Sequence, residues 1–178
     1  WNPESTSDYS GQNYLDSFVT GSGTSITAAH LPLTEIALTG EGAELESQTT
    51  TAGGVATLNE SYAALVAGYP YTSTCELVNA EGGNPMGTAQ GKIKRIDKLS
   101  IRLLNSLGFQ YGVDTSDLTE FVERTTQTNL GERPRLYSGV RRDFMDGGYD
   151  FDSSVAIEQS RPYPLNILAV MMEWKVNP

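Results

Sequence analysis

The chain has 178 residues, of which 38% are apolar and 19% charged, a length that suits one domain or two small ones. Its 18 Gly and 8 Pro favour a turn-rich globular body over a helix bundle. A formal net charge of −10 argues against nucleic-acid wrapping and docking on anionic membranes. The single Cys excludes an internal disulfide, and one Cys with one His cannot supply a structural zinc site.

The ends of the chain carry few structural signals. Residues 1–13 are rich in Ser, Asn and Gly, and we expect an entry loop or linker there. The sequence opens Trp1-Asn2-Pro3 without a signal-peptide pattern, which suggests a piece of a longer protein. The most apolar run, Leu165–Met172, is too short for a membrane-spanning helix. We therefore expect no membrane insertion of this segment.

Residues 14–178 read as one mainly β domain that contains a small β unit at about 26–71. Short stretches of Thr, Val, Ile and Leu in this unit are separated by glycines, which is typical of strands and turns. The segment Ala63–Gly68 is predicted to be a strand that ends in a turn. A hairpin is predicted to join residues 45–47 to residues 55–58.

Beyond residue 91 the pattern predicts further strands and one short helix. Leu99, Ile101 and Leu103 alternate with polar residues, as in a half-buried strand. Residues 117–122 offer an acidic N-cap and a Glu three positions on, which predicts a helical turn or two. Residues 165–174 are apolar on both faces and predict a central strand. The predicted fold is a β-sandwich or barrel-like platform with a small inserted β unit and at most one short helix.

Charge divides the chain into two halves. Residues 1–91 hold ten acids and no Lys or Arg, whereas residues 92–178 hold twelve of each sign. One interpretation is ordinary solvation of an acidic surface; the other is a surface that repels phosphate. The candidate channel or interface acids are Glu35, Glu41, Glu44 and Glu46.

The basic residues begin with one cluster, Lys92, Lys94, Arg95 and Lys98. On a strand, Lys92, Lys94 and Lys98 would share a face and Arg95 would point to the other. The cluster suits contact with phosphate. Pairing with the acidic half, either within one chain or from a neighbouring subunit, explains both features without an external ligand.

The residues that commonly carry catalysis are sparse. His30 is the only imidazole base, and we expect a structural or surface role for it. Cys75 has no cation nearby in sequence, so we expect a small buried side chain without reactivity. Asp146, Asp150 and Asp152 would suit calcium, but a hairpin turn explains them better. The sequence thus predicts no catalytic residue, no metal and no cofactor, and a protein that is not an enzyme.

Three segments in order resemble the C-terminal part of the nozzle, or tail tubular, proteins of short-tailed bacteriophages. They are Gly68-Tyr69-Pro70-Tyr71-Thr72-Ser73-Thr74, then Gln90-Gly91-Lys92-Ile93-Lys94-Arg95-Ile96, then Pro162-Tyr163-Pro164-Leu165-Asn166-Ile167-Leu168-Ala169-Val170-Met171. The resemblance spans about residues 14–174 and implies a structural virion protein of the tail. It implies a hexameric ring next to adaptor and fibre proteins, enclosing a channel through which double-stranded DNA leaves without specific binding.

The charge of the acidic half adds to this interpretation, and two alternatives stand beside it. An acidic channel wall would let DNA slide, because a basic wall would hold the phosphates by releasing counterions. Alternatively, nine Tyr and two Trp suit a host-surface or carbohydrate-binding β module, in which Tyr62, Tyr69 and Tyr71 would line an exposed groove. Hydrolase activity ranks third, because acids are present without a recognisable catalytic arrangement.

Overall fold

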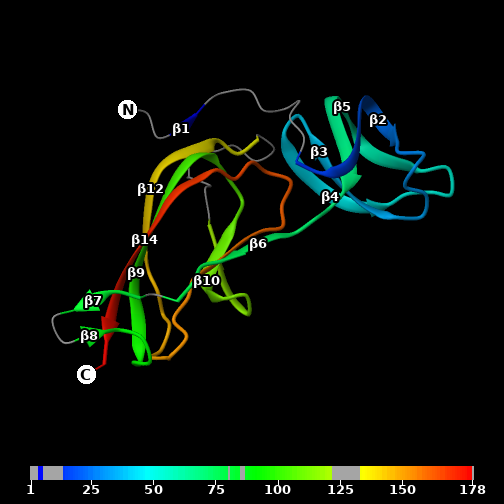
Figure 1. The fold of residues 1–178 in the computed structure, drawn as a ribbon. Coiled ribbons are helices and arrows are strands. Elements are labelled where there is room, and N and C mark those ends of the chain that lie inside the picture. The colour runs from blue at the N-terminus through cyan, green and yellow to red at the C-terminus, as the bar shows by residue number, and fades with distance from the viewer. Residues whose placement is uncertain (1–3, 6–13, 80, 85–86, 122–132, 178) are drawn as a thin grey trace.

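Strands make up every regular element of the computed structural model (Figure 1). The structure describes all residues except 1–3, 6–13, 80, 85–86, 122–132 and 178. Within that part of the chain there is no helix, and the strands form three four-stranded antiparallel sheets and one small two-stranded ribbon. The mainly β fold class predicted from sequence is confirmed.

Two of the sheets build the body of the molecule. Sheet A has the order β1 (Glu4–Ser5), β12 (Leu136–Phe144), β9 (Lys94–Ser106) and β14 (Ile167–Val176). Sheet C has the order β11 (Asp117–Glu120), β10 (Gln110–Asp114), β13 (Ala156–Gln159) and β6 (Ser73–Glu76). The ribbon consists of β7 (Gly83–Asn84) and β8 (Gly87–Thr88).

Sheets A and C share one hydrophobic core, so the body is a sandwich. Leu99, Ile101 and Leu103 of β9 point into this core, as their alternation predicts, and each is almost fully buried. The opposite sheet contributes Ile157, with Phe109 just before β10. The rings of Phe109 and Phe121 stack with centroids 4.6 Å apart, which adds a specific aromatic contact to the burial of apolar surface.

The third sheet forms a separate small β unit, drawn at the right of Figure 1. Sheet B has the order β2 (Asp16–Thr27), β5 (Val55–Tyr69), β3 (Glu35–Gly40) and β4 (Ala43–Thr49). It has a hydrophobic core of its own, built on Ile36, Leu38 and Leu65. The unit is inserted between β1 and β6 of the body and begins before residue 26, because β2 starts at Asp16.

Two local predictions within sheet B have opposite outcomes. Ala63–Gly68 lies in β5 and is a strand, as expected. The predicted hairpin between residues 45–47 and 55–58 is wrong, because β3 lies between β4 and β5 and pairs with both. The chain crosses over β3 before it returns as β5, a connection that local turn residues do not specify.

The predicted helix and the predicted central strand are also wrong. Asp117–Glu120 forms β11, because each of its residues finds a partner on β10. Pairing in the sheet thus overrides the N-cap pattern. Strand β14 lies at an edge of sheet A and not at its centre. One of its faces packs on the core through Val170, Met172 and Trp174, while Met171 is 47% exposed.

Of the predicted linker 1–13, Glu4–Ser5 forms β1 against β12, and the remaining residues lie outside the described part of the chain.

Candidate functional site

The four candidate acids lie together on strands β3 and β4 and the turn between them. Glu35 accepts a hydrogen bond from Ser47 Oγ at 3.0 Å, and Glu41 accepts one from the backbone N–H of Ala63 at 3.1 Å. Glu44 and Glu46 follow on β4; Glu35, Glu41 and Glu46 are exposed, and the Glu44 side chain is partly covered, with 37% of its area exposed. The small β unit therefore presents a surface of acidic character.

The four basic residues do not form one face. Lys94 is 2% exposed and lies on the same face as Ile96, whereas Lys98 points outward. A β-bulge at Asp97 causes this, because Trp174 pairs with Ile96 and Glu173 with Lys98. The extra residue shifts the side-chain alternation by one position. The predicted shared face of the lysines is therefore wrong.

The cluster also pairs with acids of its own half of the chain. Arg95 lies 2.7 Å from Asp97, and Lys98 lies 3.1 Å from Glu173. Lys92 lies in the turn before β9. Arg95 and Lys98 thus pair with acids of residues 92–178, and not with the acidic half of the same chain.

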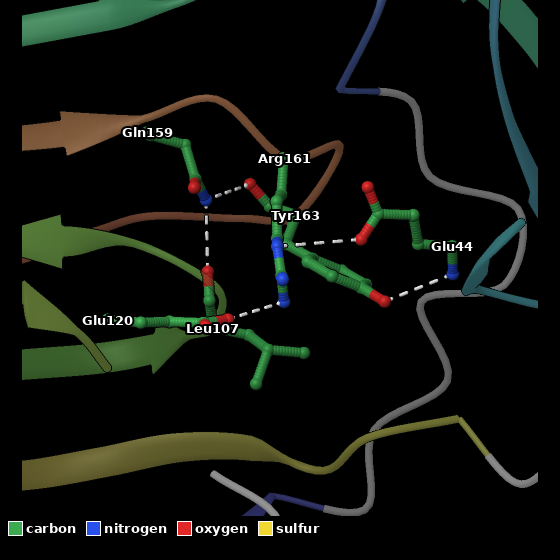
Figure 2. A network of polar contacts seen from close by, with 6 residues as sticks. All are labelled: Glu44, Leu107, Glu120, Gln159, Arg161 and Tyr163. Atoms are coloured by element: carbon green, nitrogen blue, oxygen red, sulfur yellow. Dashed lines mark hydrogen bonds and ion pairs between the residues drawn. The ribbon is translucent and has the colours of Figure 1, made fainter. Parts of the chain in front are cut away.

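The two halves of the chain are joined instead through Arg161 (Figure 2). Its guanidinium lies 3.7 Å from Glu44 of the small β unit and 2.8 Å from Glu120 of the body. Arg161 follows β13, so it places a cation between a carboxylate of sheet B and one of sheet C. We call this set of contacts, with those of Tyr163 and Gln159, the joint.

Tyr163 and Gln159 make the deeper part of the joint (Figure 2). The backbone N–H of Glu44 donates to the Tyr163 hydroxyl at 3.0 Å. The Gln159 amide donates to the carbonyls of Leu107 and Tyr163, both at 2.9 Å. The Tyr163 ring packs with Leu107 and Leu136 in a small buried cluster. The small β unit is therefore joined to the body by the Tyr163 hydroxyl and the Arg161–Glu44 ion pair, while the apolar cluster fixes the Tyr163 ring within the body.

Electrostatics distinguish Glu44 from the other acids. Partial burial raises the pKa of Glu44 above its usual value; Arg161 lowers it and Glu120 raises it further. Because the folded-state pKa is raised, the stability linked to this carboxyl is present at low pH and is lost as pH rises through that pKa.

A second polar cluster lies against the sandwich core. The Tyr111 hydroxyl donates to Asp143, and Arg141 lies 3.4 Å from the same carboxylate. Burial, followed by the interaction with Asp143, raises the pKa of Tyr111 to about 12. The Tyr111 hydrogen bond in turn lowers the pKa of Asp143. The cluster ties β10 to β12 across the two sheets, which is a structural role.

An open groove of about 1070 Å³ lies beside β6, between residues 76–81 and the loop 147–154. Glu76, Asp114 and Asp152 are among its lining residues. No group of Asp, Glu, His or Cys that is suited to hold a metal ion occurs among the described residues. The loop that carries Asp146, Asp150 and Asp152 connects sheet A to sheet C, so the predicted hairpin turn is wrong.

The remaining candidates are at or near the surface. His30 Nε2 lies 2.6 Å from the Ser17 carbonyl oxygen, in contact with β2. Cys75 is exposed on β6, so the expectation of a buried thiol is wrong. Tyr69 and Tyr71 are about half exposed, but Tyr62 packs against the core of the small β unit. The three tyrosines therefore do not line one exposed groove.

The joint was not predicted from sequence. Arg161 stands alone after a strand, a pattern that is equally typical of a solvated surface residue. The nearest signal is Gln159, a polar residue on the apolar side of β13, since buried polar side chains have hydrogen-bond partners to find.

No protein-family model matches this chain, and no match was found among curated proteins. The described residues contain no helix of the length and apolar character that a membrane crossing requires.

Proposed function

We propose that this chain is a structural virion protein, a wall segment of the nozzle ring in the tail of a short-tailed bacteriophage. Copies of the chain form the ring, adaptor and fibre proteins adjoin it, and double-stranded DNA passes through its channel. The residue pattern in the three segments quoted above supports this proposal, together with an all-strand architecture. The proposal assigns no catalytic residue.

The joint is the structural observation that carries the proposal. A wall around a DNA channel needs subunits whose parts keep a fixed arrangement when neighbours press on them. Here Arg161 is held between Glu44 and Glu120, while Tyr163 bonds the backbone of β4. Surface ion pairs contribute little by themselves, but the Tyr163 ring that carries the hydroxyl is fixed by Leu107 and Leu136 in a buried cluster of the body.

Measuring the mass of the purified protein by light scattering tests this proposal. We expect a closed ring, and six copies are the number that the resemblance implies. Electron microscopy of the same sample should show ring-shaped particles. A protein that remains monomeric at all concentrations, in the presence and absence of its tail neighbours, would contradict the proposal.

A host-surface or carbohydrate-binding module is the alternative, and the exposure of two tyrosines favours it. Tyr69 is 49% and Tyr71 52% exposed, at the connection between the small β unit and the body. Aromatic faces of this kind stack on sugar rings. A glycan-binding assay decides the matter: binding that is lost in Tyr69→Ala and Tyr71→Ala, but retained in Tyr149→Ala, a tyrosine that is 48% exposed on the loop 147–154, would favour the module.

A further inference from the structure

The outward face of sheet A combines arginines with exposed apolar side chains. Register places Val140, Arg102 and Ala169 in one row across β12, β9 and β14. The next row holds Arg142, Ser100 and Met171, and the third holds Phe144, Lys98 and Glu173. We call these nine residues the outer face. They lie on the side of the sheet opposite to the core residues Leu99, Ile101 and Leu103.

This face is more apolar than solvation alone requires. One face of an antiparallel sheet is commonly exposed to water and is then mostly polar. Here Phe144 is 78%, Met171 47% and Val140 36% exposed. Aromatic residues, Met and Arg are the types enriched in protein–protein interfaces. Phe144, Met171, Arg102 and Arg142 are of these types, so the outer face offers four exposed side chains that a second protein could cover.

The charge of the outer face is positive. Lys98 is neutralised by Glu173 at 3.1 Å, but Arg102 and Arg142 have no acidic partner within the described part of the chain. Both arginines are exposed. The partner surface that fits them carries carboxylates at its centre or rim.

This chain has such a surface on its small β unit. No Lys or Arg occurs before residue 92, and Glu46 and Glu60 are exposed on β4 and β5. The small β unit and sheet A lie in different parts of the molecule (Figure 1). A contact between two different surfaces of identical subunits is head-to-tail, and such contacts build rings when the rotation closes.

We propose that the outer face of sheet A binds the acidic small β unit of a second copy of this chain. Arg102 and Arg142 pair with carboxylates of the partner copy, Glu46 and Glu60 among them, and Phe144 and Met171 are buried in the contact. This inference rests on the proposed ring and names the surfaces that form it. It places those acids at contacts between copies, and it covers a basic face that would otherwise retain DNA in the channel.

Charge reversal tests the contact in sedimentation and light-scattering measurements of self-association. Arg102→Glu with Arg142→Glu, and separately Glu46→Lys with Glu60→Lys, should each weaken association at least about ten-fold. The four substitutions together should restore it, because the two charges are exchanged. The matched control is Lys92→Glu with Arg135→Glu, which changes net charge equally at positions outside the strands. It should associate like the native chain.

Each result bears on a different claim. Association that persists in both double variants, or that the fourfold variant does not regain, would overturn this contact but not the proposed ring. A native chain that never associates would overturn both proposals. Retention of duplex DNA that is lost in Arg102→Glu with Arg142→Glu, while association is unchanged, would assign the outer face to nucleic acid instead. Weaker association at high salt supports the contact.

Discussion

Replacing Gln159 by Leu should destabilise the fold more than replacing an exposed glutamine would. Gln159 is 9% exposed, and its amide donates to the carbonyls of Leu107 and Tyr163, both at 2.9 Å. These carbonyls belong to the segments that meet at the joint. Leucine has a similar size but no donor, so the substitution removes both hydrogen bonds from a site with little access to water.

The magnitude follows from three contributions. Each lost hydrogen bond costs about 1 kcal/mol, and a buried acceptor left without its donor raises this to about 1–3 kcal/mol. One gain offsets part of the loss, because Gln159 Oε1 is buried and has no hydrogen-bond partner among the described residues. Removing that oxygen returns about 1 kcal/mol. For the two hydrogen bonds together, the expected net destabilisation is about 1–5 kcal/mol.

Equilibrium unfolding in urea measures this difference. The midpoint should fall while the dependence of the unfolding free energy on urea stays unchanged. Gln90→Leu is the matched control, because the Gln90 amide bonds Glu81 at 2.8 Å but is exposed; we expect less than about 0.5 kcal/mol there. Equal effects of the two substitutions would refute the argument that burial at the joint gives Gln159 its importance.

Three further predictions concern other sites. Tyr111→Phe should flatten the loss of stability between pH 10 and 12, and it should reduce the stability gained above the Asp143 pKa. Both effects are expected because both pKa shifts depend on the hydrogen bond between Tyr111 and Asp143. Melting temperatures measured across pH check this, and an unchanged pH profile would contradict it. Gly112→Ala should destabilise by more than about 1 kcal/mol, because its Cβ would overlap the backbone of β11, whereas Gly148→Ala, with open space around it, should be nearly neutral in urea unfolding. In the native chain, stability should decrease as pH rises through the Glu44 pKa, and Glu44→Gln should lack this decrease. A steeper decrease in the variant would show that the Glu44 pKa is not raised by folding.

Residue alternation predicted much of the fold. Leu99, Ile101 and Leu103 repeat at every second position, and all three are buried on one face of β9. The same rule failed for Lys94 and Lys98, because the bulge at Asp97 shifts the alternation between them. A bulge depends on how the partner strand pairs, which the local sequence does not specify.

The position of a strand in its sheet was also beyond the sequence pattern. Residues 165–174 are apolar on both faces, which usually indicates a central strand, yet β14 is an edge strand with Met171 and Leu168 exposed. If the outer face is covered by a second copy, the same apolar residues are buried in the assembly. The failed prediction is then explained by the partner and not by the single chain.

The joint illustrates a different limit. Glu44 and Arg161 are far apart in the sequence. Their charged groups come within 3.7 Å only when sheet B packs beside the body in the folded chain. Glu44 was selected from sequence as one of four candidates among the ten acids of residues 1–91. Its cation was not, because no pattern in either segment marks the other.

The central claim is that copies of this chain form the wall of a tail channel, and imaging the intact assembly tests it most directly. Electron cryo-microscopy of the purified ring, or of a phage tail that contains the protein, should show six copies around an open axis. Each small β unit should lie against sheet A of the next copy. A reconstruction in which the protein is a separate peripheral module, remote from the DNA path, would contradict the account.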